Sequence, residues 1–213
     1  MSIDLTFADI PYEFMLLDQY VDLLETNLPA IVEADKKRIW ENAAKEDDSD
    51  GVASDVARHL EMLLEDGITT RFLASSAFVA IWASYEAAVR RFAQYLATKK
   101  GATDMPRRNG TFVARARKYF SNVLGVPLHD AAADWDRLEE LAKIRHAIAH
   151  ANGRLEDIEN AHDVALLKRL AASGRGIALV DEYLVLTVPF LRDSFTFLEA
   201  LVVELQRRVE AIA

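Results

Sequence analysis

Apolar residues recur at helical spacing along most of this 213-residue chain, and that periodicity restricts its fold more than any other feature. Side chains three or four positions apart lie on one face of an α-helix, so the pattern predicts helices that each bury one face. Only 8 glycines and 5 prolines interrupt it, which favours long helices and few turns. The sequence therefore predicts an all-α fold.

Breaks between the predicted helices lie at an acidic run that ends at Gly51, at Asp66-Gly67, across 101–110 and at Gly125-Val126-Pro127. Pro29 falls within the first helical segment and is expected to kink or interrupt it. The expected helices cover about 11–45, 54–65, 68–96, 112–123, 131–150, 158–172 and 189–209.

The periodicity changes after the breaker at 173–176. Residues 177–180 and 183–187 are rich in β-branched and aliphatic side chains, which predicts two short strands and a β-hairpin before the last helix. Asp181-Glu182 would form its turn, although this pair is not a favoured one. Without a repeat or linker, we expect a single domain over 1–213, with an acidic helical extension over about 1–66 and a core over about 68–213.

Charge is distributed unevenly along the chain, whose net charge is −9. Residues 1–66 hold 17 acidic and 5 basic side chains, whereas residues 90–118 hold 9 basic side chains and one acid, Asp104. Local potential decides where a polyanion docks, so the second segment is a candidate RNA-binding surface. Solvated helix faces are the alternative explanation. The candidate RNA-binding residues are Arg107, Arg108, Arg115 and Lys118.

Other functions are disfavoured by composition. The chain has no cysteine, so disulfides and thiolate metal sites are excluded. We expect no secretory signal, because the first residues lack a basic and then an apolar segment. No apolar run is expected to reach the length of a membrane span, so the expected location is cytoplasmic, with no membrane partner and no cofactor.

The segment Arg145-His146-Ala147-Ile148-Ala149-His150 contains the most informative polar residues. Arg145 falls near the centre of an apolar stripe, where an unpaired guanidinium would be costly, so it needs a buried partner, a cleft or an anionic ligand. Histidine is the side chain best suited to proton transfer near neutral pH, and His150 follows close to the helix end. The expected stripe comprises Trp135, Leu138, Leu141, Ala142, Ile148 and Ala149.

Five residues of helix separate Arg145 from His150 by about 140°. The two side chains therefore do not form a compact pair on one straight helix. They converge only if the helix unwinds at Asn152-Gly153 or if a second subunit completes the site.

The arginine and histidine, with polar His146 after the arginine and Asn152-Gly153 after the helix, resemble the R-x(4–6)-H motif of HEPN domains. Residues 83–86 resemble the second core helix of that family, and residues 135–145 its motif helix. The hairpin and the final amphipathic helix resemble the tail of RNase-like members. The likeness covers roughly Phe72 to the C-terminus.

This resemblance implies a HEPN-like helical bundle and, in active members, a metal-independent endoribonuclease that acts as a homodimer on RNA. Many such proteins are toxins or defence effectors with an antitoxin protein, and others are non-catalytic RNA- or protein-binding modules. Some toxins are silenced by modification of a tyrosine two residues after the motif histidine. Asn152 holds that position here, so we do not expect that route.

The implied catalytic residues are His150, as general acid or base, and Arg145, which would stabilise the phosphate. His146 would support either residue or position RNA, and Asn152 would end the helix beside them. Glu86 has an apolar neighbourhood in its predicted helix, so it either orients Arg145 or is an ordinary edge residue.

Structural and metal-binding explanations compete with this assignment. His150 could be a helix-terminal histidine favoured by the macrodipole, and Arg145 could pair with Glu86 or another buried acid. His146 and His150 are also spaced as a helical zinc-binding pair, with His129 or His162 as a third ligand. The glutamate that usually follows the first histidine of such pairs is replaced by Ala147.

Overall fold

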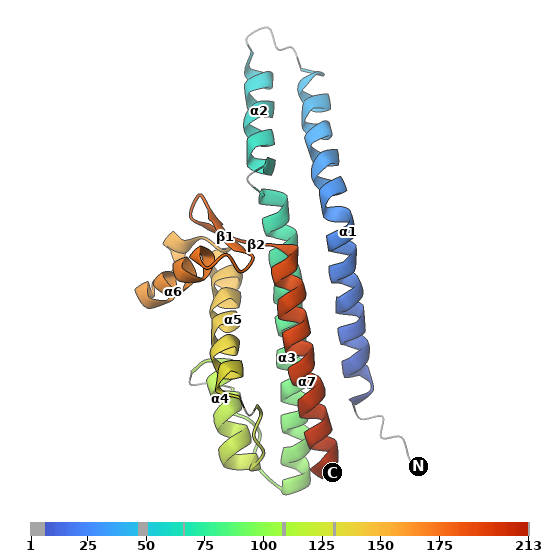
Figure 1. Cartoon of the computed structure of the whole chain (residues 1–213), viewed down its shortest axis with the longest axis vertical. Coiled ribbons are helices and arrows are strands. Elements are labelled where there is room, and N and C mark those ends of the chain that lie inside the picture. Colours follow the sequence, from blue (N-terminus) through green and yellow to red (C-terminus); the bar gives the residue numbers. More distant parts are fainter. Residues whose placement is uncertain (1–6, 47–50, 66, 108–109, 130, 213) are drawn as a thin grey trace.

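The computed structural model describes residues 7–46, 51–65, 67–107, 110–129 and 131–212. The predicted mostly helical fold with a hairpin before the last helix is confirmed (Figure 1). A π-type turn extends α4 over Phe120–Leu124, and a 3-10 turn covers Leu155–Asp157. The helices and strands are α1 (Asp9–Ala43), α2 (Val52–Glu65), α3 (Ile68–Lys100), α4 (Phe112–Tyr119), α5 (Ala132–Ala151), α6 (Ala161–Ala172), β1 (Ile177–Val180), β2 (Tyr183–Leu186) and α7 (Val188–Ile212).

The long helices α1, α3 and α7 run side by side and pack against one another (Figure 1). Helix α3 lies at the centre of the fold, because it also contacts α2, α5 and β2. A helix covered on several sides must be apolar around much of its circumference. The largest buried side chains of α3 are Phe78, Ile81, Trp82, Tyr85, Phe92 and Leu96.

The first half of α1 belongs to the bundle and is not a separate extension. Phe14 packs against Phe195 of α7, with ring centroids 6.0 Å apart. Arg192 of α7 forms ion pairs with Asp18 and Asp22 of α1. Part of the acidic segment is therefore neutralised across the α1–α7 contact. The second half of α1 and its partner α2 project beyond the end of α7 (Figure 1).

Of the two outcomes expected at Pro29, an interruption of the helix does not occur, because α1 continues through this residue. Proline removes one backbone hydrogen bond and crowds the preceding turn. Leu24 and Leu28, just before it, are buried against the rest of the fold. Packing of this face outweighs the local cost.

Helix α3 also corrects the expectation that no apolar segment reaches the length of a membrane span. By length and composition alone, α3 is long and apolar enough to cross a membrane. A buried core helix passes the same test, and much of α3 is buried here by α1, α5 and α7. The finding is therefore weak evidence about a membrane.

The hairpin pairs β1 with β2 antiparallel, from Ile177 opposite Leu186 to Val180 opposite Tyr183. Its turn residues Asp181 and Glu182 have φ of 48° and 63°. Two consecutive positive φ values are those of a type I′ turn, which matches the twist of the strands. The predicted turn therefore forms at Asp181-Glu182, although this is not a preferred residue pair for it.

The hairpin also holds the chain that follows α5. The Leu184 N–H donates to the Gly153 carbonyl at 2.8 Å, and the Leu155 N–H donates to the Glu182 carbonyl at 2.9 Å. These two bonds attach the end of the motif helix to β2. The motif therefore lies where α5, α6 and the hairpin meet.

Candidate active site

Helix α5 positions the motif by burying one face against α3, α4 and α6. It ends as expected at Asn152, whose φ is 48° and whose N–H donates to the Ala147 carbonyl. The Gly153 N–H donates to the same carbonyl at 3.0 Å. Left-handed residues of this kind close helix C-termini.

The buried face of α5 differs from the expected stripe. Its centre is occupied by Ile144 and Ala147, whereas Arg145 is half-buried at its edge. Ala142 is also half-buried and Ala149 is exposed. The expectation that Arg145 lies near the centre of the apolar face is therefore wrong. The buried residues of α5 are Trp135, Leu138, Leu141, Ile144, Ala147, Ile148 and Ala151.

Among the described residues, Arg145 nevertheless has no polar partner. Its Nε is buried and has no hydrogen-bond partner, and no ion pair of its guanidinium occurs within the described part of the chain. Glu86, one of the alternative partners for Arg145, does not pair with it. Glu86 instead accepts from Trp82 Nε1 at 2.7 Å and from Arg90 Nη2 at 2.8 Å. Arg145 therefore remains available for an anion.

His146 and His150 lie together on the exposed side of α5. Both side chains are exposed, and their ring centroids are 4.6 Å apart. The helix is regular through Ala151, so the predicted unwinding that would bring Arg145 to His150 does not occur before the motif ends. Arg145 and His150 stay about 140° apart around the axis. The structure thus brings the two histidines together, and leaves Arg145 on a neighbouring face.

Two charged residues, Lys143 and Asp163, lie near the histidines, and the sequence analysis did not predict Asp163 there. Lys143 lies three positions before His146, hence on the same ridge of α5. Its Nζ donates to the buried Asp163 of α6 at 3.0 Å. Asp163 is held by the N-cap of α6, where the Asn160 side chain accepts its N–H. Spacing along α5 signals Lys143, but no local pattern signals Asp163.

Partial desolvation of its ring lowers the pKa of His146 below its ordinary value, although the residue lies at the surface. The positive field of His150 lowers it further, the Asp163 carboxylate opposes the shift, and Lys143 and Arg145 add smaller lowering effects. His146 is therefore predominantly neutral at neutral pH, as a proton acceptor must be.

This shift predicts that acid destabilises the fold through His146. The folded chain holds this proton less tightly than the unfolded chain, so the penalty is absent above pH of about 6.5 and grows as the pH falls below that value. Thermal unfolding followed from neutral to mildly acidic pH should show a steeper loss of Tm for the wild type than for His146→Gln. His162→Gln, an exposed histidine of α6, is the control. Equal slopes for wild type and His146→Gln would contradict the assignment.

The basic segment forms a second polar site. Arg107 and Arg115, with Arg90 of α3, line a cavity of about 490 Å³. Arg115 and Lys118 line an adjoining cavity of about 270 Å³. The buried Arg115 Nε has no hydrogen-bond partner among the described residues. Arg108 lies outside the residues that the structure describes.

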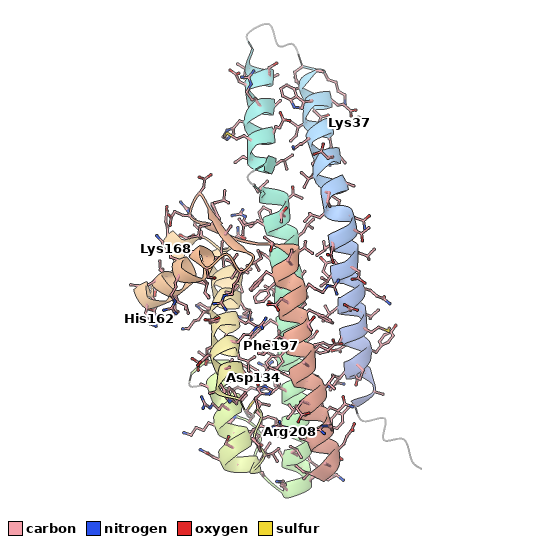
Figure 2. The ribbon with its side chains drawn as sticks, in the orientation of Figure 1. Lys37, Asp134, His162, Lys168, Phe197 and Arg208 are labelled. Carbon is pink, nitrogen blue, oxygen red and sulfur yellow. The ribbon has the colours of Figure 1, made fainter. Side chains whose placement is uncertain are left out.

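The basic segment and the motif lie at opposite ends of α5. Arg117 of α4 lies over the Trp135 ring, 4.8 Å from its centroid. Trp135 precedes Arg145 by ten residues, which is about 15 Å along the axis. Figure 2 labels Asp134 at the α4 end of α5 and His162 on α6 at the other. A polyanion that contacted both sites would therefore have to run along α5.

The structure places His129, one candidate third metal ligand, away from the His146–His150 pair. His129 is buried, 3.0 Å from the Tyr85 hydroxyl through its Nε2, and packs on Trp135 near the start of α5. It is therefore far from His146 and His150. Within the described ranges, no group of three or more His, Asp or Glu side chains is arranged to hold a metal ion.

Comparison with protein-family models, curated proteins and solved structures finds no match to this chain. The resemblance to HEPN domains therefore rests on the motif and the order of elements alone.

Proposed function

We propose that this protein is a metal-independent endoribonuclease of the HEPN type. The observation that carries the proposal is the exposed His146–His150 pair, with rings 4.6 Å apart, on the helix that also presents the unpaired Arg145. Two imidazoles supply an acid and a base, and a guanidinium supplies a phosphate ligand.

The proposed reaction is transesterification within RNA. One imidazole removes the proton of a ribose 2′-hydroxyl, whose oxygen attacks the adjacent phosphorus. The bond from phosphorus to the 5′-oxygen breaks, and His150 donates a proton to that leaving oxygen. The products are a 2′,3′-cyclic phosphate and a 5′-hydroxyl. His146 suits the role of base because its pKa is lowered, and Arg145 stabilises the negative charge of the transition state.

A homodimer is part of the proposal, because Arg145 and His150 lie on different faces of a regular helix. A second copy that placed its motif opposite the first would bring one chain's arginine to the other chain's histidine. We further propose a cytoplasmic toxin or defence effector controlled by an antitoxin protein, in line with the family resemblance.

The test is cleavage of mixed-sequence RNA by purified protein in the presence of EDTA. We expect cleavage at unchanged rate with the chelator and fragments that end in a 2′,3′-cyclic phosphate, which acid treatment followed by phosphatase removes. Intact RNA under all conditions, or fragments with a 5′-phosphate, would refute the proposal.

The basic segment is expected to bind the RNA backbone. Arg107→Gln and Lys118→Gln should each raise the Kd for RNA several-fold and lower the slope of log K against log salt by about one, because each removes one phosphate contact. Lys37→Gln is the matched control, since Lys37 is exposed and lies on the projecting half of α1 (Figure 2). Fluorescence anisotropy across a salt series measures both quantities. Equal effects of all three changes would indicate only a loss of total charge.

A non-catalytic RNA- or protein-binding module is the second candidate. It is favoured by one observation: within the described residues, neither His146 nor His150 has a hydrogen-bond partner that would orient its ring. This candidate predicts RNA binding without cleavage, and a dimer that Arg145→Ala destabilises. Analytical ultracentrifugation of that variant beside the cleavage assay separates the two functions.

A further inference from the structure

A buried arginine without a polar partner lies beside the hairpin, away from the motif. Arg71, in the first turn of α3, is 9% exposed. Its Nη1 is buried and has no hydrogen-bond partner. Its guanidinium lies over the Tyr183 ring, 3.9 Å from the centroid, and makes no ion pair with any residue that the structure describes. A cation–π contact offsets only part of the cost of burying this charge.

Arg71 lines a cavity of about 250 Å³ between α2, the start of α3 and the hairpin. The cavity is mostly apolar, with one buried cation, which is the pattern of a site for a small amphipathic anion. Its apolar walls are Leu63, Ile68, Val180, Val185 and the Tyr183 ring.

The start of α3 adds a second attraction for an anion at this cavity. Gly67, which also lines the cavity, is the N-cap residue of the helix and provides no capping side chain. The first N–H groups of a helix lack internal partners, and the N-terminus carries the positive end of the dipole. Asp181 at the cavity adds one negative charge, which disfavours a doubly charged ligand such as phosphate.

We propose that this cavity binds a small organic acid as its carboxylate. The carboxylate accepts hydrogen bonds from Arg71, and an apolar chain or ring packs against Tyr183 and the aliphatic walls. Arginine pairs with a carboxylate through two parallel hydrogen bonds, which would satisfy the buried Nη1. The site is separate from the histidine pair, so the proposal does not depend on nuclease activity.

The test uses 3-phenylpropanoate and hexanoate as probes, with 3-phenylpropanamide as the neutral control. At tenfold its Kd, either acid should raise the Tm of the full chain by about 3 °C, and the amide should not. Arg71→Met should abolish the shift, and Arg71→Lys should weaken binding measured by calorimetry. Arg154→Gln should bind like the wild type, because Arg154 is the more exposed arginine near the same ring, 6.0 Å from its centroid.

The Tm of Arg71→Met without ligand shows whether Arg71 stabilises or destabilises the ligand-free fold. A buried arginine that serves to bind a ligand lowers the stability of the ligand-free protein. Arg71→Met should therefore melt at the same or a higher temperature than the wild type. The proposal is overturned if neither acid binds the wild type, if the acids shift Arg71→Met equally, or if inorganic phosphate binds in their place. A lower Tm for Arg71→Met together with no acid binding would assign Arg71 to the fold through Tyr183.

Discussion

Replacing His150 with alanine is expected to lower the rate of RNA cleavage by about 10²–10⁴-fold, the usual contribution of general acid–base catalysis. The side chain is exposed and, among the described residues, its ring contact is with His146, so the fold should survive the change. Single-turnover cleavage of a labelled RNA measures the chemical step, and circular dichroism checks the fold. His162→Ala, which removes another exposed histidine, should cleave like the wild type.

A mixed dimer extends this experiment to the composition of the site. Arg145→Ala and His150→Ala homodimers should both be inactive. If each site takes arginine from one chain and histidine from the other, a dimer of one Arg145→Ala chain and one His150→Ala chain keeps one intact site and about half the activity. If each site lies within one chain, the mixed dimer is inactive. Cleavage by the His150→Ala homodimer at the wild-type rate would refute the catalytic assignment itself.

The helices and the hairpin were predictable because each buries one face, and a buried face leaves a periodic trace in the sequence. The boundaries of β1 and β2 and the end of α5 at Asn152 followed from such local signals. The course of α1 through Pro29 did not, because packing of the neighbouring turns outweighs a local preference.

The candidate site was predictable only in part. The motif residues are close together in the sequence, so His146 and His150 could be chosen as candidates from the sequence alone. Helical spacing, however, placed Arg145 too near the centre of the buried face. Asp163 could not be found, because it reaches Lys143 only through the packing of α6 on α5. Contacts between elements distant in sequence depend on packing that periodicity does not encode.

Trp82→Ala is expected to lower the free energy of unfolding by about 3–5 kcal/mol, the cost of removing a buried tryptophan side chain. Trp82 is among the largest fully buried side chains of the central helix, and its Nε1 donates to Glu86 at 2.7 Å. Trp82→Phe keeps most of the packing but leaves that carboxylate without this donor, so it should cost about 1–2 kcal/mol. Urea denaturation followed by circular dichroism measures both values.

The role of Glu86 can be tested with Glu86→Gln beside Trp82→Phe. Its side chain is 16% exposed and bonded within α3, to Trp82 and Arg90. A residue that supports only α3 should leave catalysis unchanged, so Glu86→Gln and Trp82→Phe are expected to cleave RNA at the wild-type rate per folded molecule. If Glu86→Gln slows cleavage while its unfolding curve matches the wild type, Glu86 instead positions the motif across the α3–α5 contact. In either case the two measurements distinguish an effect of Glu86 on the stability of α3 from an effect on catalysis by the motif residues of α5.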